Sequence, residues 1–152
     1  MNQADGGWVE TEGANCDTNA TLFAFLKSAG KVQWRVEEEL RAQGLSAAKF
    51  DVLLQLVKAG EPLPLRLLAE GQHCVPSNMT TLIDRLEADG LVRRVDDPAD
   101  RRSKRAQLTP EGELRARQGT ATIEAMNARF DELLGVRGRD AIELMIVNLD
   151  SF

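Results

Sequence analysis

Residues 63–112 constrain the fold of this 152-residue chain more than any other stretch. They predict a short helix at 65–70, a turn, a second helix from Pro76 and two short strands, with little sequence between them. Proline is tolerated at the first position of a helix, and Gly90 provides a C-terminal stop. The apolar residues of the second helix have the i, i+3, i+4, i+7 spacing of one buried stripe: Met79, Leu82, Ile83 and Leu86.

The opposite face of this second helix is polar, and most of its side chains are small. Its residues are Ser77, Asn78, Thr80, Thr81, Asp84 and Arg85. A DNA major groove admits a helix with such a face, and the amide of Asn78 can form two hydrogen bonds with adenine. We therefore expect this helix to contact DNA through Ser77, Asn78, Thr80, Thr81 and Arg85.

Two strands, 91–95 and 104–108, are predicted next, joined by a polar loop with a proline turn signal. Their alternation places Val95, Ala106 and Leu108 on an inner face and leaves Arg93, Arg105 and Gln107 to water. Residues 91–105 contain six Arg or Lys and three Asp, a local net charge of +3 in a chain of net charge −5. The basic residues therefore gather on this hairpin, although the chain as a whole is acidic.

Two adjacent arginines, Arg101 and Arg102, stand at the tip of the hairpin. Such a position suits a minor groove or phosphate groups better than a core. For four cations both phosphate contact and simple solvation remain open: Arg93, Arg94, Arg101 and Lys104.

The run PSNMTTLIDRLEADGLVRR, followed by DPADRRSKRAQLTPEG, resembles the winged helix-turn-helix of the MarR-type (multiple antibiotic resistance regulator) family. The hallmark Asp-x-Arg of that family's wing falls on Asp100 and Arg102. The resemblance implies a mainly α fold with a small β-hairpin wing and with N- and C-terminal dimerisation helices. It also implies a homodimeric transcriptional regulator, usually a repressor controlled by a ligand or an oxidant. Asp100 would orient Arg102 in a minor groove by a charge-assisted hydrogen bond.

This sequence departs from the family pattern at two positions of the second helix. Thr81 stands where the family often has an arginine, so this helix is expected to bind phosphate and to recognise guanine less strongly. DNA affinity then depends more on the wing. Val75 stands where a serine or threonine would usually cap the helix. Two-fold symmetry of the implied dimer predicts a pseudo-palindromic double-stranded DNA site with half-sites about one helical turn apart.

The resemblance also implies an effector pocket between the dimerisation helices and the DNA-binding lobe, often filled by an aromatic acid. Lys27, Lys31, Trp34 and Arg35 can supply cationic and aromatic surface there, although they also suit a solvent-facing helix.

Two cysteines are candidates for redox control. An oxidant-sensing branch of the family has its reactive cysteine near the position of Cys16, and Cys74 precedes the recognition helix, where a helix N-terminus favours a reactive thiolate. That branch also uses a tyrosine, which this chain lacks. An ordinary thiol is the alternative for both residues.

The remaining sequence predicts one intertwined domain. Residues 1–17 form a polar N-terminal segment, 18–44 and 111–152 a helical dimerisation region, and 45–110 the DNA-binding lobe. Helices are predicted at 18–43, at 47–58 after Ser46, and at 110–134, with a break at 135–138 before a last helix at 139–149. Residues 61–64 are expected to form a rigid connector. The long helices carry more apolar surface than so small a lobe can bury, which predicts a homodimer.

Composition argues against an enzyme, a metalloprotein and a membrane protein. The chain has one histidine, His73, no Cys/His cluster and no phosphate-binding glycine loop. No apolar run approaches the roughly 18 residues of a membrane span, and the N-terminus lacks the pattern of a secretory signal. Two distant cysteines make no disulfide framework. We expect a cytoplasmic DNA-binding protein without a cofactor; a winged-helix module that binds proteins and not DNA is the alternative of another class.

Overall fold

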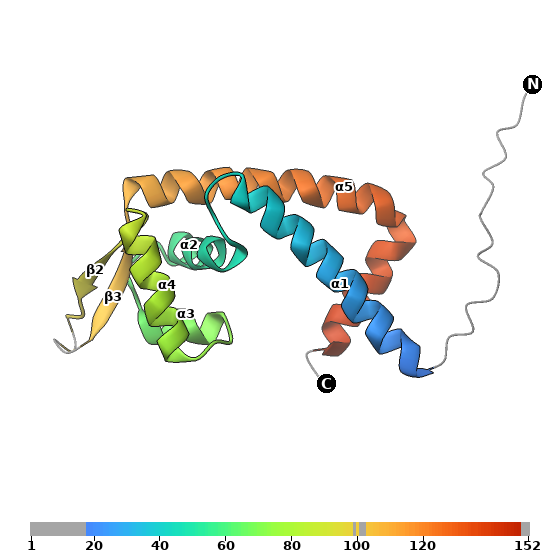
Figure 1. Ribbon diagram of the computed structural model, residues 1–152, viewed down its shortest axis with the longest axis horizontal. Coiled ribbons are helices and arrows are strands. Elements are labelled where there is room, and N and C mark those ends of the chain that lie inside the picture. Colours follow the sequence, from blue (N-terminus) through green and yellow to red (C-terminus); the bar gives the residue numbers. More distant parts are fainter. Residues whose placement is uncertain (1–17, 99, 101–102, 150–152) are drawn as a thin grey trace, which may run out of the picture. The chain divides into compact units, whose positions relative to one another are not determined.

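The computed structural model describes residues 18–98, 100 and 103–149, which form a mainly helical chain with one small sheet (Figure 1). Its elements are α1 (Thr18–Arg41), α2 (Ala47–Ala59), β1 (Leu63–Pro64), α3 (Leu65–Gly71), α4 (Pro76–Ala88), β2 (Val92–Asp96), β3 (Lys104–Leu108) and α5 (Pro110–Leu149). The chain divides within α1 into two units, one ending at Trp34 and one beginning at Arg35. The second unit contains the complete winged helix. None of the described helices is both long enough and apolar enough to cross a membrane.

Local sequence signals define most helix ends. The Ser46 hydroxyl accepts a hydrogen bond from the Lys49 N–H at 3.2 Å, which caps α2, and Gly60 ends that helix in the left-handed region at φ +66°. Thr109 caps α5 in the same way by accepting from the Gly112 N–H at 3.0 Å. These caps confirm the predicted starts of α2 and α5 and the predicted end of α2 at Gly60.

The sheet is antiparallel, with strand order β1-β3-β2. The prediction of a connector at 61–64 was incomplete, because Leu63 pairs with Ala106 and so adds a short edge strand. The first wing strand begins at Val92, one residue later than predicted, while Leu91 is buried in the turn before it. The Leu91 carbonyl accepts the Thr109 N–H at 3.1 Å, so this turn holds the start of α5.

The core of the lobe lies where α2, α3 and α4 meet the sheet and the first part of α5. Its fully buried large side chains are Leu40, Val52, Leu53, Leu56, Leu68, Met79, Ile83, Leu86 and Val92. The apolar spacing of Phe50, Leu53, Leu54 and Val57 predicts that these residues of α2 face this core, but Val57 is 44% exposed. Val52 and Leu56 are buried in its place, because α2 packs on α5 as well as on the helix-turn-helix and so turns a wider face inward.

α5 has one sharp irregularity, at Gly135, with φ +61° and ψ −176°. The predicted four-residue break is therefore confined to one glycine, and the helix continues to Leu149. The sequence spacing predicts one apolar face of α5, formed by Ile123, Met126, Phe130 and Leu133. The first three are half-buried, whereas Leu133 is 85% exposed. Among the described residues, the second half of α5 thus leaves large apolar side chains exposed.

Candidate nucleic-acid interface

α4 presents a polar face outward because its opposite stripe is fixed in the core. Met79, Ile83 and Leu86 are fully buried and Leu82 is half-buried, as the sequence predicts. The candidate DNA-contacting residues of the helix, Ser77, Asn78, Thr80, Thr81 and Arg85, are all exposed, as is Asp84. The helix therefore offers hydroxyl, amide and charged groups to a partner.

The two threonines of this face are oriented by the helix backbone. The Thr80 hydroxyl donates to the Pro76 carbonyl at 3.1 Å, and the Thr81 hydroxyl donates to the Ser77 carbonyl at 3.2 Å. A hydroxyl has one proton, so each oxygen remains available to an outside partner as an acceptor only. The start of the helix has no side-chain cap, as the sequence indicates, because its N-cap residue is Val75.

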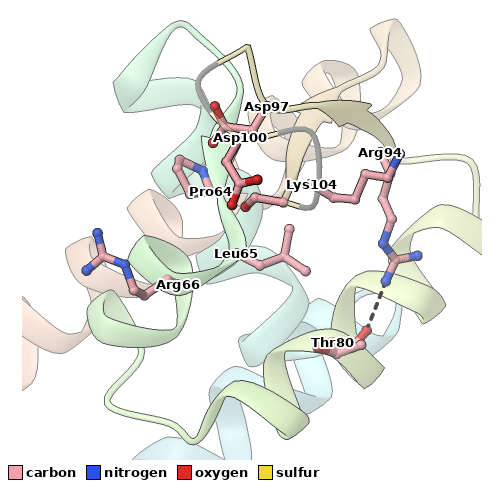
Figure 2. Close-up of a pocket in the computed structure, with 9 residues that line it drawn as sticks. Pro64, Leu65, Arg66, Thr80, Arg94, Asp97, Asp100 and Lys104 are labelled. Carbon is pink, nitrogen blue, oxygen red and sulfur yellow. Dashed lines mark hydrogen bonds between the residues drawn. The ribbon is translucent and has the colours of Figure 1, made fainter.

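Arg94 of β2 links the wing to α4. Its guanidinium lies 2.5 Å from an Asp84 carboxylate oxygen and 2.6 Å from Glu87. Figure 2 shows the hydrogen bond that the same guanidinium donates to the Thr80 carbonyl, at 3.4 Å. The Arg94 backbone N–H also donates to Glu87, at 2.9 Å. This backbone hydrogen bond, and after it the guanidinium, lower the pKa of Glu87 below its usual value. Arg94 was expected as a phosphate contact or a solvated charge; the structure gives it two carboxylate partners, and its contact with DNA stays a prediction.

We expect Arg94→Met to lower the free energy of unfolding by about 1 kcal/mol, because it leaves two partly exposed carboxylates beside each other without their cation. The matched control is Arg93→Met, since Arg93 is exposed and its guanidinium donates only to Gln107, at 3.0 Å, among the contacts described. Urea unfolding of both variants at pH 7 measures the difference. Equal midpoints for the two variants would show that the link between α4 and β2 does not stabilise the lobe.

The same link has a defined pH dependence. The pKa of Glu87 is lowered in the folded chain. The ionised Glu87 carboxylate therefore contributes fully to the free energy of unfolding above the ordinary pKa of 4.5, and this contribution is lost as the pH falls through the lowered pKa. The difference in the free energy of unfolding between wild type and Arg94→Met is therefore expected to become smaller below pH 4.5.

The base of the wing is held by a second ion pair that the sequence did not reveal. Asp97 is only 7% exposed, and its carboxylate lies 3.0 Å from Arg105 Nε and 3.1 Å from Nη2. Arg105 also donates to the Pro62 carbonyl at 3.4 Å. The prediction that Arg105 faces water was wrong, because a buried carboxylate draws it inward. The sequence signal was weak: an aspartate directly before the loop proline, with an arginine on the returning strand.

Other candidate wing cations have local partners or lie outside the described residues. Lys104 pairs with Asp96. Asp100 is exposed, and its carbonyl accepts the Ser103 N–H at 2.8 Å, which closes the described part of the loop. Arg101 and Arg102 lie outside the described residues, so the predicted partnership of Asp100 with Arg102 stays a prediction.

An open pocket of about 570 Å³ lies between the start of α3, α4 and the wing (Figure 2). Its lining is mixed in charge, with the cations Arg66, Arg94 and Lys104 and the carboxylates Asp97 and Asp100. The described residues contain no group of three His, Cys, Asp or Glu side chains placed to hold a metal ion.

Four candidate effector-binding residues belong to α1. Lys27, Lys31, Trp34 and Arg35 are exposed along α1, so the structure leaves their role as effector contacts a prediction.

Of the two candidate redox residues, Cys16 lies outside the described chain. Cys74 is half-buried against the core, and the neighbouring His73 takes the left-handed conformation of a turn at φ +50°.

Comparison with known proteins shows what the winged helix of this chain is similar to. Residues 45–104, the helix-turn-helix and most of the wing, match the model of the MarR family. Over 100 residues the chain is 34% identical to the HTH-type transcriptional repressor MdtR of Bacillus subtilis, covering 66% of this chain and 64% of that relative. Residues 45–104 of this chain are a MarR-family winged helix. The chain spans just under two thirds of the length of that curated relative.

Solved structures show that the MarR-family likeness extends through the flanking helices. A MarR-family regulator from Rhodococcus sp. RHA1 is 27% identical with a TM-score of 0.74, covering 91% of this chain and 95% of that one. CouR from Rhodococcus jostii RHA1, solved with p-coumaroyl-CoA bound, is 28% identical with a TM-score of 0.74, covering 93% and 94%. The winged-helix fold with its N- and C-terminal helices, expected from the resemblance, is therefore confirmed.

Proposed function

We propose that this chain is a homodimeric transcriptional repressor of the MarR family and that it binds a pseudo-palindromic DNA operator. The observation that carries the proposal is the exposed polar face of α4, joined through Arg94 to a hairpin of net charge +3. A helix of this kind suits a major groove, and an adjoining hairpin with arginines at its tip suits the neighbouring minor groove. The similarity to a relative named as a repressor supports repression over activation of transcription.

The apolar surface of the flanking helices supports the homodimer. Large apolar side chains that are more than half exposed lie on α1 (Leu22, Phe23, Leu26, Trp34) and on α5 (Leu133, Val136, Leu144, Ile146, Val147). Exposed apolar surface on this scale marks an interaction site, and a second copy of the chain is the partner we propose. Two-fold symmetry then places one α4 on each half-site, about one helical turn of DNA apart.

The distribution of charge suits selective binding. The chain carries −5 overall, so the charge outside residues 91–105 is −8. An acidic remainder repels DNA except where the wing docks, which limits non-specific association. The protein is therefore proposed to depend on the wing for phosphate affinity, with Arg102 in the minor groove.

We further propose that an aromatic acid or its thioester releases the repressor from DNA. The support is CouR, a structural neighbour solved with p-coumaroyl-CoA. Lys27, Lys31 and Arg35 recur at four-residue intervals on α1 and so share one side of the helix, and Trp34 adjoins them. Cations suit the carboxylate or phosphates of such a ligand, and the indole suits its ring. The ligand can act only by binding one spacing of the DNA-binding lobes more tightly than the other.

The first test is fluorescence anisotropy of a duplex taken from the DNA upstream of this protein's own gene, measured over a salt series. We expect tight, salt-sensitive binding that exceeds binding to a scrambled duplex. Arg102→Ala is expected to weaken binding about tenfold and to flatten the salt dependence, because one charge-assisted contact is lost. Arg117→Ala is the matched control, since Arg117 is an exposed α5 residue whose described partner is Glu113, at 3.0 Å.

A protein that binds neither this duplex nor a random pool would contradict the proposal and favour a winged helix that contacts proteins. Equal effects of Arg102→Ala and Arg117→Ala would remove Arg102 from the interface. Repeating the titration with p-coumaroyl-CoA, and separately with p-coumarate, tests the effector: release by either supports the proposed class, and unchanged binding with both rejects it.

A further inference from the structure

We infer that the first two turns of α4 select A·T base pairs, with Asn78 contacting adenine and the Thr81 methyl group contacting thymine. This inference rests on the proposed DNA-binding function and deepens it, because it names the base pairs that the helix prefers. It follows from which chemical groups the fold leaves on the outer face of α4 and from which groups it removes.

The buried stripe fixes which residues can reach bases. At about 100° per residue, Ser77 and Thr81 lie nearly opposite the buried Met79 and Ile83, at the centre of the exposed face. Thr80 lies on the edge that faces β2, where Arg94 donates to its carbonyl. Asn78 lies on the other edge, away from the wing. A helix seated in a groove therefore presents Ser77, Thr81 and Asn78 to bases from its N-terminal end.

Within α4, no cation lies at this end of the helix. Guanine is read in the major groove chiefly by arginine or lysine, which donate to its two acceptors. The only cation within α4 is Arg85, in the last turn. Arg94, the nearest cation on the wing strand, is held by Asp84 and Glu87 at 2.5 and 2.6 Å. The bidentate donor that guanine requires is thus missing from the first two turns.

The groups that remain suit A·T pairs. The exposed amide of Asn78 has both a donor and an acceptor, which match the N7 acceptor and the N6 donor of adenine. The Thr81 hydroxyl is turned to the Ser77 carbonyl at 3.2 Å, so its methyl group is left on the outer surface. A methyl group packs favourably against the C5-methyl of thymine, which cytosine lacks.

Arg85 lies too far along α4 to affect the A·T preference of the first two turns. It follows Asn78 by seven residues on the same edge of the helix, about 10 Å further along the axis. That separation corresponds to about three base-pair steps at 3.4 Å each. A guanine contact from Arg85 therefore falls at a separate position of the half-site and leaves the A·T preference of the first two turns intact.

The test is selection of the full-length protein against a pool of random duplexes, followed by sequencing of the bound fraction. We expect each enriched half-site to contain an A·T pair whose preference falls about 5- to 150-fold in Asn78→Ala. Arg85→Ala is the matched control on the same helix edge, and it is expected to leave that pair unchanged. Both side chains are exposed, so neither change threatens the fold.

Two base analogues in the enriched duplex test the contacts directly. Replacing the selected thymine by uracil removes only its methyl group and is expected to weaken binding of the wild type about fourfold. Replacing the selected adenine by 7-deazaadenine removes one acceptor and is expected to weaken the wild type but not Asn78→Ala.

The outcomes separate this inference from the proposed function. Enrichment of half-sites in which no A·T preference depends on Asn78, or in which guanine occupies the Asn78-dependent position, overturns the A·T inference and leaves the repressor in place. Failure to enrich any sequence overturns the proposed function, and the inference with it.

Discussion

Gly112→Ala is expected to lower the free energy of unfolding by about 3 kcal/mol, the upper part of the usual range for overpacking. A Cβ atom at Gly112 would lie 1.9 Å from the Leu91 carbonyl oxygen and 3.0 Å from Leu108 Cδ2. The Leu91 oxygen belongs to the backbone and also accepts the Thr109 N–H, so it cannot move without separating α5 from the start of β2. Urea unfolding followed by circular dichroism, at one fixed protein concentration, measures the loss.

Gly30→Ala is the matched control for this prediction. Gly30 is also helical, but a Cβ atom there meets no atom within 4 Å. Alanine is a better helix former than glycine by about 0.5–1 kcal/mol, so this variant is expected to be as stable as wild type or more stable. If Gly112→Ala unfolds at the same urea concentration as Gly30→Ala, the close approach of α5 to Leu91 is not a constraint on the fold.

Leu133→Asp is expected to convert the proposed homodimer to monomers and to weaken DNA binding about 100-fold or more. Leu133 is 85% exposed within one chain, so an aspartate there disturbs no intramolecular core. In a dimer it would bury an unpaired charge, which costs several kcal/mol. A monomer binds only one half-site and loses the gain of about 10²–10⁴ that two linked sites provide. Analytical ultracentrifugation and anisotropy measure the two effects.

Asn127→Asp is the matched control for Leu133→Asp. It adds the same charge to the same helix, and the aspartate side chain has nearly the same shape as the asparagine that it replaces. Asn127 is exposed and lies on a different side of α5 from Leu133, since six residues separate them. This control is expected to stay dimeric and to retain affinity. A Leu133→Asp protein that sediments as a dimer would place the interface elsewhere, and a wild-type monomer with full affinity would remove the dimer from the proposal.

Short-range patterns in the sequence predicted the winged helix well. The stripe from Met79 to Leu86 defines both the buried side of α4 and its polar face, because a helical repeat acts within a few turns. Ser46, Gly60 and Thr109 set helix ends through hydrogen bonds or backbone conformations within four residues. Such signals need no knowledge of distant segments, and they placed these elements to within a residue or two.

The partners of the wing side chains were less accessible to sequence reasoning. Arg94 and Arg105 were both read as outward cations, yet Arg94 binds Asp84 and Glu87, while Arg105 binds the buried Asp97. An alternating strand pattern says which way a side chain points but not which carboxylate approaches it. The short strand at Leu63 was missed for the same reason, because it exists only by pairing with Ala106.

The sequence by itself therefore determined the order of the helices, their caps and the polar face of α4, since these depend on neighbours along the chain. Tertiary structure decided that Arg94 joins the wing to α4, that Gly112 can carry no side chain beside Leu91, and that Leu133 stays uncovered. Each of these depends on atoms from separate segments that meet, or fail to meet, once the chain has folded. Such distances are absent from composition and periodicity.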